Sequence, residues 1–456
     1  MAADFKVPRP RRYLNADHLI ARLRDRFSKV ADARRKTSDG YTMTDTLASA
    51  FAMFSLKEPS LLSFEERSNE ESIERLFGVK KVPSDTQMRT ILDGIDIEPL
   101  NQAFADLFYE LQRGGVLKKW EFDRGHYLLA IDGTGHFCSS KIRCKHCLER
   151  KVGESTQYHH QAVAAVITHP ETKEVIPLAV EPIVKQDGES KNDCERNATS
   201  RLLRRVRKLY PKLKLIVIED GLASNAPHIA DLKACNMRFL LGAKPGDHGH
   251  LFKQVVEASD RSRVETIQVI DPASVDPVSV DPASLENVIS ETQFISDLPL
   301  NKSNEEVRVN FLQHVEYDPQ SGAVMKRFSW VTDIDIPRSK MLLYQRGGRS
   351  RWRIENETFN TLKNQGYHYE HNYGHGKKNL STVLMLLMFL AFTVDQIQQA
   401  CCPLFQAVLE KLKTRRKLWD HLRSHVRHFS FARFVDLWAT ILRGTGKNRS
   451  PPSCFA

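Results

Sequence analysis

The order of the apolar runs between residues 126 and 242 limits most strongly what this chain can fold into. The runs read strand, strand, strand, helix, strand, helix, strand, over residues 127–131, 161–168, 174–184, 194–209, 213–218, 227–235 and 238–242. Three consecutive strands can pair as an antiparallel meander, whereas strand–helix–strand units require parallel pairing. The sequence therefore predicts an α/β fold built on a mixed five-stranded sheet covered by helices.

The segments around this core divide the chain into five predicted regions. They are a helical basic region (1–115), a first part of the core (116–249), a β-rich insertion (250–345), a second part of the core (346–395) and a helical C-terminal region (396–456). Within the insertion, a five-residue unit repeats over 271–285 (DPASV, DPVSV, DPASL). Proline at every fifth position excludes a regular helix or a central strand, so we expect an exposed irregular loop there.

Composition narrows the classes of partner and compartment. The chain has 456 residues and a net charge of +11, which fits a polyanionic partner such as nucleic acid. Its longest uncharged apolar stretch, residues 380–394, is shorter than the ~20 residues of a membrane-spanning helix, so we expect a core helix and no membrane. With no recognisable export signal and few cysteines, the sequence predicts a cytoplasmic protein with reduced thiols.

The N-terminal region contains a candidate DNA-binding motif. Residues 69–77 predict a short helix, and a second helix begins after Ser84, where Gln87 completes a capping box. Two short helices across a tight turn form either a helix-turn-helix or a plain helical hairpin. In a helix-turn-helix, Thr86, Gln87 and Arg89 would face the DNA groove.

Two aspartates mark a candidate metal site at the sheet. Asp132 and Asp220 both follow an apolar strand-like run and precede a glycine, a position that turn chemistry alone also favours. The first and fourth strands of the predicted sheet can be parallel neighbours, which brings both carboxylates to the edge where open α/β sheets bind ligands. Carboxylate oxygens are preferred ligands of Mg²⁺ and Mn²⁺.

A third carboxylate is offered by a predicted helix that begins near Arg349. Arg351 and Glu355 lie on one face of this helix because they are four residues apart. The same spacing also describes an ordinary ion pair on a solvated helix surface.

These three acidic segments resemble those of a known enzyme family. The segments AIDGTG, VIEDGLASN and RWRIENETFNTLKNQGY are similar to those of bacterial insertion-sequence DDE transposases, in the cut-and-paste group with a Tyr-Arg-Glu-Lys signature. The resemblance spans about residues 125–395. It implies a ribonuclease-H-like core, a β-rich insertion before the glutamate, and two Mg²⁺ or Mn²⁺ ions held by Asp132, Asp220 and Glu355.

The signature is matched only in part. Arg351 stands at the signature arginine, but the tyrosine position falls at Gly348, with Tyr344 the nearest upstream candidate. The lysine position falls at Leu362, and Lys363 is one residue late. Eight residues carry a regular helix about 80° past the face of Glu355, so Lys363 needs a long reach or a local distortion.

Two other acidic residues compete for the third carboxylate. Glu357 lies two residues after Glu355 and would point away from its face, and Glu370 lies further along the chain. Asp187 and Asp193, on a charged loop near the sheet edge, either assist the metals or belong to a solvated turn.

The resemblance implies that the enzyme cleaves and joins the ends of an insertion sequence by two-metal phosphoryl transfer, with Arg351 and Lys363 as phosphate clamps. Its partner would be double-stranded DNA, both terminal inverted repeats and target, bound by a homodimer in the bacterial cytoplasm at the nucleoid. The alternatives are an inactive transposase-derived DNA-binding protein and a simple metal-dependent nuclease. Residues 367–378 (YHYEHNYGHGKK), with Lys377 and Lys378, either contact DNA or form a polar loop.

A cysteine pair offers a second candidate metal site. Cys144 and Cys147 have the spacing of half a zinc site, with His136, Cys138 and the pair His159–His160 nearby. No second matched pair follows at the usual interval, which favours reduced surface cysteines on a loop between strands.

Overall fold

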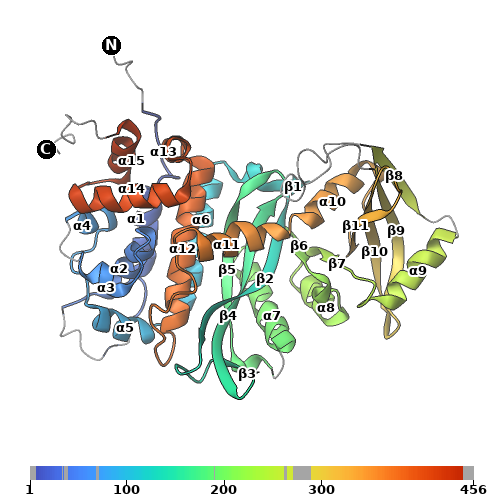
Figure 1. Ribbon diagram of the computed structural model, residues 1–456, viewed down its shortest axis with the longest axis horizontal. Coiled ribbons are helices and arrows are strands. Elements are labelled where there is room, and N and C mark those ends of the chain that lie inside the picture. Colours follow the sequence, from blue (N-terminus) through green and yellow to red (C-terminus); the bar gives the residue numbers. More distant parts are fainter. Residues whose placement is uncertain are drawn as a thin grey trace, which may run out of the picture.

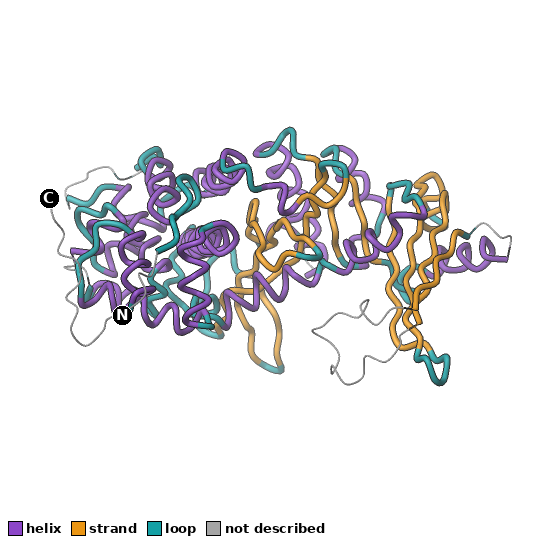
Figure 2. Tube along the Cα trace, turned by 90° about the horizontal axis from the view of Figure 1, so that it is seen from above, coloured by secondary structure: helices purple, strands orange, loops and turns teal. Residues whose placement is uncertain are grey.

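The structure of the protein is a computed structural model that describes residues 7–444, except 33, 35–39, 68–70, 189–190, 261–263 and 271–288. The repeat at 271–285 lies outside the described residues. Along the long axis of the molecule, a helical body comes first, a sheet-containing middle second, and a strand-rich end third (Figure 1). The view from above shows the same order, with helices gathered at one end and long strands near the other (Figure 2).

The helical body combines both ends of the chain. Its helices are α1 (Ala16–Phe27), α2 (Met43–Ser55), α3 (Leu61–Glu65), α4 (Glu71–Phe77), α5 (Asp85–Asp93), α6 (Glu98–Arg113), α12 (Leu380–Cys401), α13 (Pro403–Leu412), α14 (Arg415–His428) and α15 (Phe434–Arg443). The Asp17 carboxylate in α1 accepts hydrogen bonds from the backbone N–H groups of Phe434 (2.6 Å) and Val435 (3.1 Å) at the start of α15. The N- and C-terminal helical regions therefore pack as one body.

Helix α12 is the centre of that body. By length and composition it is apolar enough to cross a membrane, but 83% of its most apolar 18-residue window is buried inside the protein. The prediction of a core helix at 380–394 is confirmed. The start of α12 is fixed by Asp93 at the end of α5, whose carboxylate accepts the N–H groups of Lys377 (3.0 Å), Lys378 (2.9 Å) and Leu380 (3.0 Å).

The middle of the molecule is the predicted mixed sheet. Its strands are β1 (Glu121–Asp123), β2 (His126–Ser139), β3 (Leu148–Val152), β4 (Ser155–His169), β5 (Thr172–Ile183), β6 (Lys214–Glu219) and β7 (Arg238–Gly242). β2, β4 and β5 pair antiparallel in sequence order, and β2, β6 and β7 pair parallel. The order β5-β4-β2-β6-β7 confirms that the first and fourth predicted strands are neighbours.

Helices cover the sheet and connect its parts. They are α7 (Lys191–Leu209), α8 (Ala226–Ala234), α9 (Gly249–Asp260), α10 (Met341–Arg349) and α11 (Asn360–Asn364), with a π-helix, η7 (Ile354–Phe359), before α11 and the short helices η1 (Leu117–Trp120), η2 (Lys185–Asp187), η3 (Gly221–Ala223) and η6 (Arg338–Lys340). The predicted apolar stripe of α7 packs on β4 and β5, where Leu202, Leu203 and Val206 are buried. The α/β class is thus confirmed.

The sheet is larger than the five strands expected. The insertion forms β8 (Glu265–Ile270), β9 (Ile289–Asn301), β10 (Asn304–Tyr317) and β11 (Val324–Thr332). β11 pairs antiparallel with β7, so the path continues as β7-β11-β10-β9-β8 and the whole sheet has 11 strands. The outer edge of β7 would otherwise leave unpaired backbone N–H and C=O groups, and β11 pairs them.

Strand β2 also differs from its prediction. The apolar run was expected to end before Asp132, but β2 continues to Ser139 because β4 pairs with it along nearly its whole length, from Leu128 to Ser139. The parallel pairing with β6 stops at Ala130. Asp132 therefore lies inside a strand, at the point where one of the two neighbouring strands has ended.

Candidate active site

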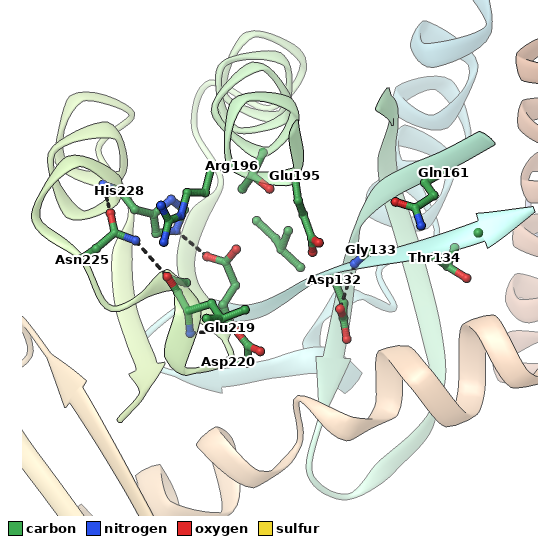
Figure 3. Close-up of a pocket in the computed structure, with 15 residues that line it drawn as sticks. Asp132, Gly133, Thr134, Gln161, Glu195, Arg196, Glu219, Asp220, Asn225 and His228 are labelled. Carbon is green, nitrogen blue, oxygen red and sulfur yellow. Dashed lines mark hydrogen bonds and ion pairs between the residues drawn. The ribbon is translucent and has the colours of Figure 1, made fainter. Parts of the chain in front are cut away.

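A cavity of about 290 Å³ opens where β2 and β6 part. Carboxylates line it from three elements: Asp132 on β2, Glu195 on α7, and Glu219 with Asp220 at the end of β6. In Figure 3, Glu195 and Glu219 point into the space between these elements, and Asp132 and Asp220 lie along its margin. The two predicted aspartates therefore share one cavity.

Asp132 is held in a partly buried, charged environment. One of its oxygens, Oδ1, accepts the N–H of Gly133 at 2.8 Å. Burial is the strongest influence and raises the pKa of Asp132 to about 7; Arg351 opposes this rise, and the neighbouring Glu355 carboxylate adds to it. Asp132 is thus half protonated near neutral pH, whereas an ordinary aspartate is fully ionised there.

Asp220 ends the neighbouring strand as an N-cap. Its Oδ1 accepts the N–H of Leu222 at 3.0 Å at the start of η3. The turn passes very close to β7: a Cβ atom on Gly242 would lie 3.1 Å from the nitrogen of Gly221 and 3.2 Å from the carbonyl carbon of Asp220. Only glycine fits at this position of β7 without a shift of backbone, so close packing fixes the turn that carries Asp220.

Arg351 connects the strand aspartate to the predicted third carboxylate. Its Nη1 lies 2.9 Å from Asp132 Oδ2 and 2.8 Å from Glu355 Oε1. Burial lowers the pKa of Arg351. The hydrogen bond to Glu355 and the nearby carboxylate charges of Glu355, Asp132 and Asp220 raise it by more, so its pKa lies above the usual value. Arg351 therefore joins Asp132 to Glu355 directly, and among the described residues the charge of Asp220 acts on it without a direct contact.

The helix after Arg351 contains a distortion that affects Lys363. Residues 354–359 are π-helical, and a π-turn takes up one residue more than an α-turn. With that extra residue, Lys363 stands about where the seventh residue after Glu355 would stand in a regular helix, within about 20° of its face. Leu362 is fully buried, while Lys363 pairs with Glu370 at 2.9 Å.

Lys363 lies near the cavity described above. It lines a neighbouring hollow of about 420 Å³ together with Gly135 and Gln161, and these two residues line the Asp132 cavity as well. Glu370, a rival for the third carboxylate, is therefore a partner of Lys363. Among the described contacts, Glu355 bonds to Asp132 and Arg351, whereas Glu357 bonds to neither.

The signature tyrosine has no counterpart at the site. Gly348 is packed against Trp330 so closely that a Cβ atom would lie 2.5 Å from the indole ring, which leaves no room for a tyrosine. The upstream candidate, Tyr344, is buried and donates its hydroxyl to Asp123 Oδ2 at 2.9 Å. Tyr344 thus stabilises the contact between α10 and β1, away from Arg351.

The predicted DNA-contacting residues of the helical body lie around the junction of α5 and α12. Thr86 and Arg89 are exposed on α5, where Arg89 pairs with Asp85 at 2.8 Å. The predicted cap is confirmed, because Ser84 Oγ accepts the N–H of Gln87 at 3.4 Å. α5 packs against α2 and α12, and the exposed Lys377 and Lys378 are joined to its end through Asp93.

Several residues of the cavity were not found from the sequence. A Cβ atom on Gly133 would lie 2.8 Å from Glu195 Oε1, so the Glu195 carboxylate lies directly against β2. The buried Glu219 bonds to His228 Nε2 at 2.6 Å. Burial lowers the pKa of His228, but the charge and hydrogen bond of Glu219 raise it by more. In the sequence, the only indication of Glu219 is its position directly before Asp220 in the segment VIEDGLASN.

Asp187 was expected either to assist the metals or to belong to a solvated turn, and it is instead buried in an ion pair. The carboxylate of Asp187 is buried, pairs with Arg201, and accepts the N–H of Val184 at 2.9 Å. It joins the short helix η2 to the middle of α7. The side chain of Asp193 lies outside the described residues.

Within the described ranges, one group of His, Cys, Asp and Glu side chains is gathered closely enough to share a metal ion, and it is not the acidic one. It consists of Cys144, Cys147, His160 and His375. The expectation of surface cysteines is wrong for Cys147, which is buried because the loop folds under the ring of His375. The sequence showed no second ligand pair at the usual spacing from the cysteines. The two histidines of the cluster come instead from strand β4 (His160) and from a loop 228 residues away from Cys147 (His375).

No protein-family model matches this chain, and a search of curated proteins found no similar sequence. The fold and the geometry of the site are therefore the basis for a functional assignment.

Proposed function

We propose that this protein is a DDE transposase with a ribonuclease-H-like core made of β5, β4, β2, β6 and β7. The observation that carries the proposal is the Arg351 guanidinium, which bonds to Asp132 and Glu355 beside the cavity that Asp220 also lines. These residues are far apart in the sequence and come from a strand, a strand end and a helix. The order of their motifs along the chain supports the same assignment.

The oxygen donors suit Mg²⁺ or Mn²⁺, and two such ions would be held by Asp132, Asp220 and Glu355. Burial, with a smaller contribution from the neighbouring Glu355 carboxylate, raises the pKa of Asp132, and the charge of a bound cation would favour its ionised form. When bound, the ions lower the pKa of the attacking water or 3′-hydroxyl and neutralise the charge that develops on the leaving oxygen.

The protein side chains supply orientation and positive charge. Arg351, which pairs with Asp132 and Glu355, would use its other N–H groups to hold a phosphate oxygen of the substrate. Lys363, turned toward the same side by the π-helix, supplies a second phosphate contact. Asp220 keeps its orientation through the N–H of Leu222.

Double-stranded DNA is the proposed substrate, as element ends and as target, with a homodimer joining two ends in the bacterial cytoplasm. Gln87, Thr86, Arg89, Lys377 and Lys378 are the proposed contacts outside the core. Asp93 ties the end of α5 to the segment with both lysines, so these side chains can act on one duplex.

The test is incubation of the purified protein with Mg²⁺ and a linear DNA that carries the gene and its flanking sequence. Strand cleavage at defined ends followed by joining is the expected result. Binding without cleavage would indicate an inactive transposase-derived DNA-binding protein, and nicking without end specificity a simple nuclease. Either outcome overturns the proposal.

The variant Asp220→Asn tests whether the cleavage activity depends on the acidic site. Asp220→Asn should lower cleavage by at least about a hundredfold, since even the hydrogen-bond partners of metal ligands are worth 10- to 100-fold. DNA binding should be retained. Asp231→Asn, at a half-buried position of α8 that pairs with Arg204 on α7, is the matched control and should cleave normally. Cleavage retained by Asp220→Asn would remove Asp220 from the site.

A further inference from the structure

The Cys/His cluster found outside the acidic site has the dimensions of a tetrahedral metal centre. Cys144 and Cys147 Sγ atoms are 3.8 Å apart, each lies 3.5 Å from His160 Nε2, and Cys147 Sγ lies 3.6 Å from His375 Nε2. All four ligand atoms lie within 4.8 Å of one another.

These separations can be compared with those around zinc. With Zn–S bonds of about 2.3 Å and Zn–N bonds of about 2.0 to 2.1 Å, the edges of a tetrahedron are about 3.8 Å between sulfurs and about 3.5 to 3.6 Å between sulfur and nitrogen. The four measured separations agree with these edges. A disulfide would need sulfurs about 2.05 Å apart, far shorter than the observed distance.

Backbone N–H groups contact both sulfurs, while burial raises the pKa of the Cys147 thiol to about 11, so a bound cation would have to displace its proton. The N–H of Cys144 donates to Cys147 Sγ at 3.3 Å, and the N–H of His146 donates to Cys144 Sγ at 3.4 Å. Backbone donors of this kind stabilise thiolates and orient metal ligands. The turn that brings the two sulfurs together is closed by a hydrogen bond from Cys147 N–H to Cys144 O at 3.2 Å.

The two histidines come from separate parts of the fold. His160 lies on β4, and His375 lies in the loop between α11 and α12, 228 residues from Cys147. The loop is shaped to present His375: Gly376 has φ +69°, and a Cβ atom there would strike the Asp93 carboxylate. His375 itself is buried against Phe137, with ring centroids 4.5 Å apart.

We infer that Cys144, Cys147, His160 and His375 bind one structural Zn²⁺ per chain, which cross-links the β2–β4 hairpin to the loop leading into α12. Two sulfurs and two imidazoles in a tetrahedron select zinc over the hard ions proposed for the acidic site. All four positions are filled by side chains, so the ion has no open position for substrate and is structural. The inference does not depend on the proposed transposase activity.

The zinc would join the middle of the molecule to its helical body. The hairpin belongs to the sheet that carries Asp132, and the loop continues into Lys377, Lys378 and α12. Loss of the ion should therefore loosen residues 367–378 before the sheet itself. Limited proteolysis with and without a chelator measures this directly.

The primary test is metal analysis of the purified full-length protein grown with zinc. One Zn²⁺ per chain is expected in the wild type, and less than about a fifth of that in Cys147→Ser and His375→Ala. The matched controls are Cys138→Ser and His159→Ala, a cysteine and a histidine that pair across β2 and β4 beside the cluster but outside it. Both controls should keep their zinc.

Replacement of the metal by Co²⁺ keeps the inference testable if a variant fails to fold. The wild-type protein should show the absorption bands of tetrahedral cobalt with a sulfur-to-cobalt charge-transfer band, and a chelator should remove them and lower the melting temperature. A wild-type protein that takes up neither Zn²⁺ nor Co²⁺, or that carries a Cys144–Cys147 disulfide after purification, overturns the inference. Equal zinc loss in the Cys138→Ser control would also overturn it.

Discussion

At the scale of single residues, the acidic site is a set of carboxylates held near one arginine. Arg351 offsets the charges of Asp132 and Glu355, which lie on different elements and would otherwise repel one another. Removal of one partner from such a group leaves the other charge uncompensated. The arrangement therefore makes Asp132 sensitive to pH and to any cation that enters.

The raised pKa of Asp132 predicts a pH-dependent affinity for metal. Below about pH 7 the carboxyl holds a proton that a cation must displace, so the apparent Kd for Mn²⁺ should fall by up to about tenfold per pH unit as the pH rises toward 7. Above that pH the affinity should level off. Calorimetric titration with Mn²⁺ at a series of pH values measures it.

Asp132→Asn is the control for this titration. The variant should bind Mn²⁺ more weakly and lose the pH dependence in this range. A wild-type affinity that stays constant from about pH 5.5 to 7 would mean that Asp132 is not a ligand.

Strand order allowed the sequence to predict that Asp132 and Asp220 lie close together, and the structure places them at one cavity, whereas Glu355 was proposed from the resemblance of its motif. Sequence reasoning could not find Glu195 or His375. Glu195 lies against Gly133 because α7 packs over β4 and β5. His375 lies beside Cys147 although the two are 228 residues apart in the sequence. No local spacing records such contacts.

At the scale of elements, the π-helix at 354–359 decides whether Leu362 or Lys363 lies on the side of Glu355. A regular helix would direct Leu362 toward Glu355's side, yet Leu362 is buried. The extra residue of the π-turn places Lys363, one position later, on the side of the helix that Leu362 would otherwise occupy. The sequence indicated that Lys363 needs either a long reach or a local distortion, and it could not choose between them because π-turns have no reliable residue pattern.

This register predicts different effects for the two members of the Lys363–Glu370 pair. Lys363→Ala should lower DNA cleavage by roughly 10- to 100-fold, the loss of one charge-assisted hydrogen bond to phosphate. Glu370→Ala removes the same ion pair but leaves the lysine, so it should cleave within about twofold of wild type. Cleavage rates under single-turnover conditions compare them. Equal losses in both variants would show that Lys363 serves only the pair.

The packing of α2 against α12 depends on a buried cation at the end of α2. Lys57 is fully buried, its Nζ lies 2.5 Å from Asp395 Oδ2, and it stands 4.1 Å from the centre of the Trp419 ring. Lys57→Ala leaves the Asp395 carboxylate with the Tyr367 hydroxyl but without its cationic partner, and should lower the free energy of unfolding by about 3 to 5 kcal/mol.

An exposed lysine provides the comparison. Lys81 stands 4.3 Å from the centre of the Tyr41 ring, and Lys81→Ala should cost less than about 1 kcal/mol. Thermal and urea unfolding of both variants measure the difference. If Lys57→Ala is no less stable than Lys81→Ala, the buried pair does not hold the helices together.

At the scale of the whole molecule, the insertion extends the central sheet instead of forming a separate body. The runs at 308–315 and 326–332 predicted strands, and they are strands. Their pairing partner could not be predicted, because β7 is only five residues long and β11 reaches it through Leu240, Leu241 and Gly242. The partner of an added strand depends on which edge strand of the folded sheet has an unpaired side, and the pattern of apolar residues does not show this.

Overall charge and the α5–α12 junction predict a strong dependence of DNA binding on salt. The logarithm of affinity should fall linearly with the logarithm of salt concentration, with a slope of about 0.9 for each phosphate contacted in a duplex. Lys377→Ala with Lys378→Ala should reduce that slope by about 2 and weaken binding to all sequences alike. Fluorescence anisotropy with a labelled duplex measures both. A slope unchanged by the double variant would remove these lysines from the DNA surface.

The most direct test of the proposed acidic site is the anomalous scattering of Mn²⁺ in crystals of the protein bound to a DNA duplex from its flanking sequence. Two manganese peaks should appear among Asp132, Asp220 and Glu355, with the Arg351 guanidinium holding a phosphate. Crystals in which DNA lies at this edge of the sheet while the three carboxylates bind no manganese would contradict the account.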